Sequence, residues 1–174
     1  MVIELLDELK EDQKKLDSFI IHKKGLTPKA NVEEKAIALL VETGELANEW
    51  RGFKFWSENQ KPKDRENLIK EAVDCLHFFI SILNDIEYTG DREEELTEIY
   101  GAIHQPSIAG PQALVKNLYK ELSLFADRQS EVRLIRALDV FDNLLISLNI
   151  TKEEMTEYYH GKNQENHERQ ENGY

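Results

Sequence analysis

The sequence predicts an all-α fold from three observations. Apolar residues recur at intervals of three and four almost throughout the 174 residues, which is the period of an amphipathic helix. Alternating apolar and polar runs, typical of strands, are absent, and proline and glycine fall between the periodic segments. A chain of this length can bury a substantial core in one domain. We therefore expect one helical domain.

The first two helices are expected within the first 50 residues. One spans about residues 3–22 and ends near Gly25, and the proline at position 28 opens a loop because the residue before a proline disfavours helix. The second spans about residues 31–50, where Asn31 and Glu34 match the capping-box pattern. The apolar seam of this second helix is predicted from four residues: Ile37, Leu40, Val41 and Gly44.

A third helix, over about residues 65–84, is the most apolar, and a turn at 88–91 closes it. Its apolar residues surround it on nearly every side, so we expect it to be buried. Two or three further helices lie between residues 91 and 149, with breaks at Gln105-Pro106 and Gly110-Pro111. Their apolar stripes are interpreted as packing or subunit contacts, an example being Leu114, Leu118, Leu122 and Phe125.

The carboxyl-terminal segment changes character near residue 160. Thr151 and Glu154 form a second capping-box pattern, which predicts a short last helix ending at about Tyr159. Residues 161–174 contain no aliphatic side chain, so their composition alone predicts a disordered tail. We thus expect a helical domain over 1–160 and a separate tail over 161–174.

Charge and cysteine content restrict the partners and the compartment. The chain has 34 acidic and 22 basic residues, a formal charge of -12, which argues against binding to duplex nucleic acid. Cys75 is the single cysteine, so no intrachain disulfide is possible and a reducing compartment, the cytoplasm, is expected. No run is apolar enough to cross a membrane, and the first residues do not resemble a signal peptide.

Two pairs of acidic residues carry the functional prediction. Glu42 and Glu45 lie on the second helix and Glu71 and Asp74 on the third, each pair spaced i, i+3 and so on one side of its helix. Carboxylates on a buried helix need protons or cations. If the helices pack side by side, the four oxygen ligands suit Mg²⁺ or Mn²⁺ and phosphoanhydride hydrolysis. From the residues alone, an acid network balanced by a lysine or arginine from another helix is equally supported.

The two motifs, Glu42-Thr-Gly-Glu45 and Glu71-Ala-Val-Asp74, resemble those of the all-α nucleoside triphosphate pyrophosphatases, which include the MazG-like proteins. Further matches at Gln13 to Asp17, at 42–56, at His77 and over 158–174 make the chain most similar to the dimeric dUTPases. The resemblance implies a MazG-like helical bundle whose most variable part is 88–149, and whose tail covers bound nucleotide. It also implies a homodimer.

The resemblance further implies hydrolysis of dUTP, and possibly dUDP as a second substrate, with dUMP and pyrophosphate as the products from dUTP. Glu42, Glu45, Glu71 and Asp74 would hold two or more Mg²⁺ ions, with Mn²⁺ as an alternative. Glu42 or Glu45, with Glu42 preferred, would activate the water. The nucleoside would contact Gln13, Trp56 and His77. The phosphates would contact Lys54, Tyr159, Lys162, Asn166, Arg169 and Tyr174.

Two alternatives stay open at this point. A related pyrophosphatase that acts on dCTP, or broadly on deoxynucleotides, would need the same four acids. A helical interaction protein without activity would instead use its acids to bind a basic partner. The apolar surroundings of Glu71 and Asp74 argue against the second alternative, because acids that meet a protein partner need not lie on a core helix.

Overall fold

The computed structural model describes residues 1–27, 31–86 and 93–173, and only the backbone of residues 93–97. Within these ranges the chain forms seven helices and no strand, which confirms the predicted all-α class. The helices are α1 (Val2–Lys24), α2 (Val32–Trp50), α3 (Arg65–Asp85), α4 (Glu93–Ile103), α5 (Pro111–Arg128), α6 (Glu131–Ser147) and α7 (Lys152–Glu171).

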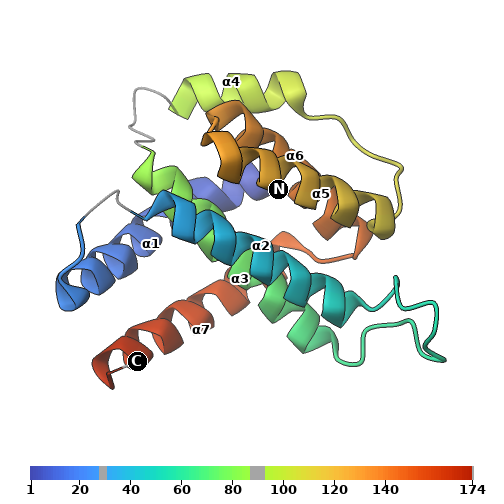
Figure 1. The fold of residues 1–174 in the computed structure, drawn as a ribbon, viewed down its shortest axis with the longest axis horizontal. Coiled ribbons are helices and arrows are strands. Elements are labelled where there is room, and N and C mark those ends of the chain that lie inside the picture. The colour runs from blue at the N-terminus through green and yellow to red at the C-terminus, as the bar shows by residue number, and fades with distance from the viewer. Residues whose placement is uncertain (28–30, 87–92, 174) are drawn as a thin grey trace.

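The helix pair α2 and α3 forms the centre of the molecule (Figure 1). Helices α5 and α6 pack together, α5 also packs on α2, and α4 lies over α6. Helix α7 lies on the opposite side from α4, where it packs along both α1 and α3 (Figure 1). The buried aromatic side chains of Phe79, Phe125 and Phe141 fill the core between α3, α5 and α6. This arrangement leaves α1, α2, α3 and α7 to form the functional region.

The ends of α1 and α3 follow the local signals of the sequence. Gly25 ends α1 with a φ of 63°, and the next residue, Leu26, donates its N–H to the carbonyl of Ile21 at 3.0 Å, which is the Schellman pattern. Asp64 begins α3 by accepting a hydrogen bond from the N–H of Glu66 at 2.9 Å. Both predicted spans are confirmed within two residues, while the predicted loop at position 28 and the turn at 88–91 lie outside the described residues.

Helix α2 differs from the prediction in two respects. Asn31 occupies the N-cap position, but its side chain makes no capping hydrogen bond, so the expected capping box is not formed. The predicted seam is wrong at two of its four positions, because Ile37 and Val41 are each 53% exposed, whereas Leu40 packs against the core. The helix turns another face to α3 and the core, formed by Ala36, Leu39, Thr43, Leu46 and Ala47.

The stripe predicted within α5 is buried, since Leu114, Leu118, Leu122 and Phe125 are each at most 3% exposed. This stripe therefore packs in the core of a single chain. Gly44 of α2 faces the same helix: a Cβ there would lie 2.7 Å from the hydroxyl of Tyr119. The absence of a side chain at Gly44 lets α2 and α5 approach closely.

Helix α7 is longer than the sequence predicts. The capping box is confirmed, with Glu154 N–H donating to Thr151 Oγ1 at 3.2 Å and Thr151 N–H to Glu154 Oε2 at 2.9 Å. The helix then continues to Glu171, where composition predicted disorder. Polar anchors replace the missing aliphatic ones: Lys162 pairs with α3, and the rings of Phe19 and His167 lie 5.3 Å apart. Composition alone cannot anticipate such contacts.

No helix among the described residues has the length and apolar character needed to span a membrane.

Candidate active site

The packing of α2 against α3 brings three of the four predicted acids together. Glu42, Glu45 and Glu71 each offer a carboxylate oxygen, and these oxygens lie within 4.8 Å of one another. Glu42 and Glu71 are partly buried, whereas Glu45 is exposed. We call these three residues the carboxylate cluster. Its spacing would allow one cation to contact all three side chains.

The fourth acid, Asp74, lies one helical turn after Glu71 but has a different partner. Its Oδ2 lies 2.7 Å from Nζ of Lys162, which α7 contributes. Both side chains are largely buried, at 16% and 19% exposure. The lysine-balanced acid network, which the sequence left open beside a metal site, is thus present for Asp74 next to the carboxylate cluster.

Burial and mutual repulsion perturb the acids. Burial, followed by repulsion from Asp74, Glu45 and Glu71, raises the pKa of Glu42 to about 7. Burial and the charges of Asp74 and Glu45 raise the pKa of Glu71 to about 6. Burial also raises the pKa of Asp74, opposed by the hydrogen bond and the charge of Lys162. A divalent cation would relieve this repulsion, and carboxylate oxygens alone make a donor set that fits a hard cation.

A cavity of about 360 Å³ is lined by residues of α1, α2, α3 and α7, and Glu42 is the member of the carboxylate cluster in its wall. Glu42 and Asp74 line it, together with Lys162, Asn166 and Arg169 from α7. Its volume is in the range of small-molecule sites, which commonly have apolar walls and a few polar groups. The other lining residues are Gln13, Leu16, Asp17, Ile20, Ile21, Leu26, Asn31, Lys35, His77, Phe78 and Ser81.

Two residues predicted at the nucleoside, Gln13 and His77, meet inside this cavity. Gln13 Oε1 lies 2.6 Å from His77 Nδ1, and both side chains are buried. The same oxygen accepts a hydrogen bond from the hydroxyl of Tyr159 at 2.8 Å. The Tyr159 ring stacks on His77 with centroids 4.1 Å apart. Burial lowers the pKa of His77 to about 3, so its imidazole is neutral at physiological pH.

This geometry changes the interpretation of Tyr159. The side chain is fully buried, it is not among the residues that line the cavity, and its hydroxyl is directed to Gln13. Its placement therefore supports a positioning role rather than the predicted phosphate contact. Lys162, Asn166 and Arg169 line the cavity as a phosphate role requires. Tyr174 lies outside the described residues.

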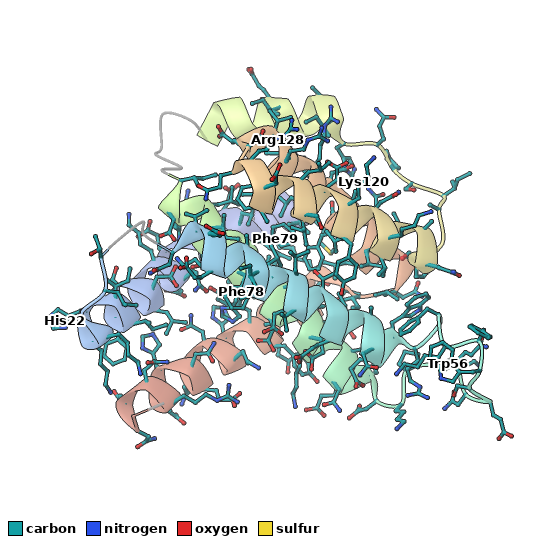
Figure 2. All side chains as sticks on the ribbon, in the orientation of Figure 1. His22, Trp56, Phe78, Phe79, Lys120 and Arg128 are labelled. Carbon is teal, nitrogen blue, oxygen red and sulfur yellow. The ribbon has the colours of Figure 1, made fainter. Side chains whose placement is uncertain are left out.

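Two predicted contacts, Lys54 and Trp56, lie away from the cavity in the loop after α2. Trp56 is 65% exposed, so its side chain is not part of the core. It lies at the outer end of the molecule, whereas the cavity-lining Phe78 lies near the centre (Figure 2). The ammonium of Lys54 bonds the side chain of Asn48. Neither residue is among those that line the cavity.

Asp17 and Ser81 also line the cavity, and the sequence analysis assigned no role to either. Asp17 Oδ1 accepts from Gln13 Nε2 at 2.9 Å, and Asp17 Oδ2 accepts from Ser81 Oγ at 2.7 Å. Each follows a predicted nucleoside residue by four positions, Asp17 after Gln13 and Ser81 after His77. That spacing places side chains on one helix face, and it was the signal available in the sequence.

The comparison with protein families agrees with the geometry. A family model described as dUTPase matches residues 5–174, which is nearly the whole chain. No curated protein matches the sequence. The matched segment contains both acidic pairs, the cavity residues and all of α7. The chain therefore belongs to the all-α dimeric dUTPase family and is a dUTP diphosphatase.

Proposed function

We propose that Glu42, Glu45, Glu71 and Asp74 hold the Mg²⁺ ions with which this enzyme hydrolyses dUTP to dUMP and pyrophosphate. The observation that carries the proposal is the carboxylate cluster, whose oxygens lie within 4.8 Å of one another beside the cavity. Bound Mg²⁺, two or more ions with Mn²⁺ as an alternative, would neutralise charge that develops on the phosphates. The raised pKa values of Glu42 and Glu71 support a site that is incomplete without cations.

Glu42 is our candidate for the general base. It is the member of the first pair that lines the cavity, so its carboxylate can accept a proton from a water beside the substrate. Glu45 is more exposed and is better placed as a ligand. Lys162 and Arg169 supply positive charge and Asn166 an amide along α7, which suits phosphate oxygens. In this proposal Lys162 leaves Asp74 and contacts phosphate when the nucleotide is bound.

The base would occupy the part of the cavity where Gln13 and His77 meet. Both side chains are neutral and buried, so they can form hydrogen bonds with the edge of an uncharged base in an otherwise apolar site. A turnover panel of dUTP, dUDP, dCTP and dTTP, with and without Mg²⁺, tests the substrate assignment. We expect dUTP to be preferred and hydrolysis to require Mg²⁺. Rates on dCTP and dTTP equal to the rate on dUTP would favour a related pyrophosphatase of other base specificity.

Alanine variants of Glu45 and Asp74 test the metal site directly. Each should abolish Mg²⁺-dependent hydrolysis of dUTP and leave the helical circular dichroism spectrum intact. The matched control is Glu58→Ala, which removes an exposed acid in the loop after α2. Full turnover in either cluster variant would refute the proposed ligands.

We propose a homodimer in solution, in which a second copy covers the exposed part of α2. Ile37 and Val41 lie one turn apart and each exposes 53% of its surface. Light scattering coupled to gel filtration measures the assembly, and Val41→Glu should convert it to a monomer because a charge would be buried in the interface. A wild-type chain that elutes as a monomer would contradict this proposal.

The cytoplasm remains the expected compartment, since the one cysteine, Cys75, is buried and free.

Lys54 and Trp56 remain candidates for nucleotide contacts. Because they lie outside the cavity, a contact would require the loop between α2 and α3 to move toward α7 on binding. The fluorescence of Trp56, in a Trp50→Phe background, reports such a movement.

A further inference from the structure

His77 carries a buried atom that the protein does not satisfy. The side chain is 6% exposed, and its Nε2 has no hydrogen-bond partner among the described residues. Unpaired buried nitrogens are rare in folded proteins because each one costs free energy. Since His77 lines the cavity, the unpaired nitrogen points to a partner supplied by the ligand.

The hydrogen-bonding character of that nitrogen depends on the tautomer of the ring. Gln13 presents its carbonyl oxygen Oε1 to His77 Nδ1 at 2.6 Å, and an oxygen can only accept. Nδ1 therefore carries the proton. In the neutral ring Nε2 is then an acceptor, which requires a donor on the ligand.

The orientation of the Gln13 amide decides this outcome. Turned by 180°, the amide would present N–H to His77, Nδ1 would become the acceptor, and Nε2 would become a donor. Tyr159 cannot select the orientation alone, because a hydroxyl both donates and accepts. Asp17 can select it: its carboxylate only accepts, and Oδ1 lies 2.9 Å from Gln13 Nε2. The turned amide would place two acceptors against each other.

The surroundings of Asp17 hold its carboxylate in place. Its second oxygen accepts from Ser81 Oγ at 2.7 Å, and Nζ of Lys35 lies 3.9 Å away. Lys35 is itself bonded to Asp85. A chain of contacts thus runs from α2 through α1 to the ring of His77 on α3.

We propose that Asp17 is a positioning and specificity-determining residue: through Gln13 it fixes His77 as the Nδ1–H tautomer, so that Nε2 accepts a hydrogen bond from the base of the substrate. The assignment rests on the proposed placement of the base in this cavity. Uracil carries a donor at its ring N3, flanked by two carbonyl oxygens. Cytosine carries an acceptor at N3, which would face the acceptor Nε2. Gln13 has a second N–H for a neighbouring carbonyl, since the Asp17 bond uses one of two.

The tautomer can be measured by two-bond ¹H–¹⁵N correlation NMR on protein labelled at histidine, with His77 assigned by its loss in His77→Gln. We expect Nδ1 to be the protonated nitrogen and Nε2 the unprotonated one in the nucleotide-free wild type. Addition of dUMP should shift the Nε2 resonance, and dCMP should leave it unchanged. A protonated Nε2 in the wild type would by itself overturn the proposal, before any variant is measured.

Asp17→Asn keeps the shape of the side chain but adds a donor, so both orientations of Gln13 become possible. We expect a mixture of His77 tautomers and a fall of about tenfold or more in the kcat/KM ratio of dUTP to dCTP, mostly through KM for dUTP. The matched control is Asp85→Asn. It removes the charge that binds Lys35 but leaves the contact between Asp17 and Gln13 intact, so the His77 tautomer should be that of the wild type. An unchanged tautomer in Asp17→Asn would refute the role of Asp17.

The two readouts separate this inference from the proposed function. The tautomer is measured on free protein and does not depend on turnover. If the wild type has the Nδ1–H tautomer but does not prefer dUTP, the proposed substrate placement fails and the hydrogen-bond chain stands. If dUTP is preferred and the tautomer is the opposite one, the role of Asp17 fails and the enzyme assignment stands.

Discussion

Replacing Glu42 by glutamine should stabilise the metal-free protein while destroying its activity. Burial and neighbouring charges raise the pKa of Glu42 from 4.5 to about 7. At about 1.4 kcal/mol per pKa unit, that difference would correspond to ~3 kcal/mol of unfavourable free energy in the ionised folded state. Because the side chain is only partly buried, solvent screening reduces the effect to about 1–2 kcal/mol.

The sign of the pH dependence follows from the folded and unfolded pKa values. The folded state binds the Glu42 proton more tightly, so the contribution of Glu42 to the stability of the wild type is fully present below pH 4.5 and is lost as the pH rises to about 7. Glu42→Gln has no such loss. Its advantage should therefore be absent at pH 4.5, grow up to pH 7 and stay constant at pH 8. For a chain of this size, the gain at pH 8 corresponds to a Tm increase of about 2–8 °C.

Differential scanning fluorimetry in EDTA, at pH values from 4.5 to 8, measures this effect. Glu58→Gln, at an exposed position, is the control and should follow the wild type at every pH. Saturating Mg²⁺ should reverse the order at pH 8, because cations bound to the folded wild type add stability that the variant lacks. A variant with an equal or lower Tm at pH 8 in EDTA would refute the repulsion inferred for the carboxylate cluster.

Three further predictions concern Lys162, Tyr100 and Trp56. Lys162→Met removes the ammonium that lies 2.7 Å from Asp74. Calorimetry should show that the nucleotide-free variant binds Mn²⁺ about fivefold more tightly than the wild type, and its KM for dUTP should rise. An unchanged Mn²⁺ affinity would show that Lys162 does not compete with cations. Tyr100→Phe removes a 2.7 Å bond to the buried Asp142 and should lower unfolding free energy by about 1–3 kcal/mol in urea titrations, with KM for dUTP unaltered. In Trp50→Phe protein, emission from Trp56 should shift to shorter wavelength when dUMP and Mg²⁺ bind; no shift would remove Trp56 from the proposed nucleotide contacts.

Much of the fold follows from local signals. The ends of α1 and α3 lie within two residues of their predicted positions, because the capping contacts at Gly25 and Asp64 join residues only two to five positions apart. The continuation of α7 to Glu171 could not be predicted in the same way. Its anchors, Lys162 on Asp74 and His167 on Phe19, join residues distant in sequence.

The exposed face of α2 was missed for a related reason. Periodicity identified apolar positions but did not indicate which of two adjacent apolar stripes meets α3. Both stripes contain aliphatic residues, and the packing chose the one with Leu39 and Leu46, leaving Ile37 and Val41 outside. A single sequence does not show which of two equally apolar stripes is buried within the chain.

The site was predictable where the motif lies on adjacent helices. The i, i+3 spacing of each acidic pair predicts that the four carboxylates converge if the two helices pack side by side, and three of the four do meet. The pairing of Asp74 with Lys162 required knowledge of where α7 lies. The positions of Lys54 and Trp56 depend on a loop, whose course amphipathic periodicity does not define.

Direct binding of Mn²⁺ to the nucleotide-free protein, followed by electron paramagnetic resonance of the free ion, tests the metal role of the acidic pairs without relying on turnover. We predict that wild-type protein and Glu58→Gln bind Mn²⁺ with the same Kd, and that Glu45→Gln and Glu71→Gln raise the Kd by about tenfold or more. The same Kd in all four proteins would contradict the assignment of these carboxylates as the metal site.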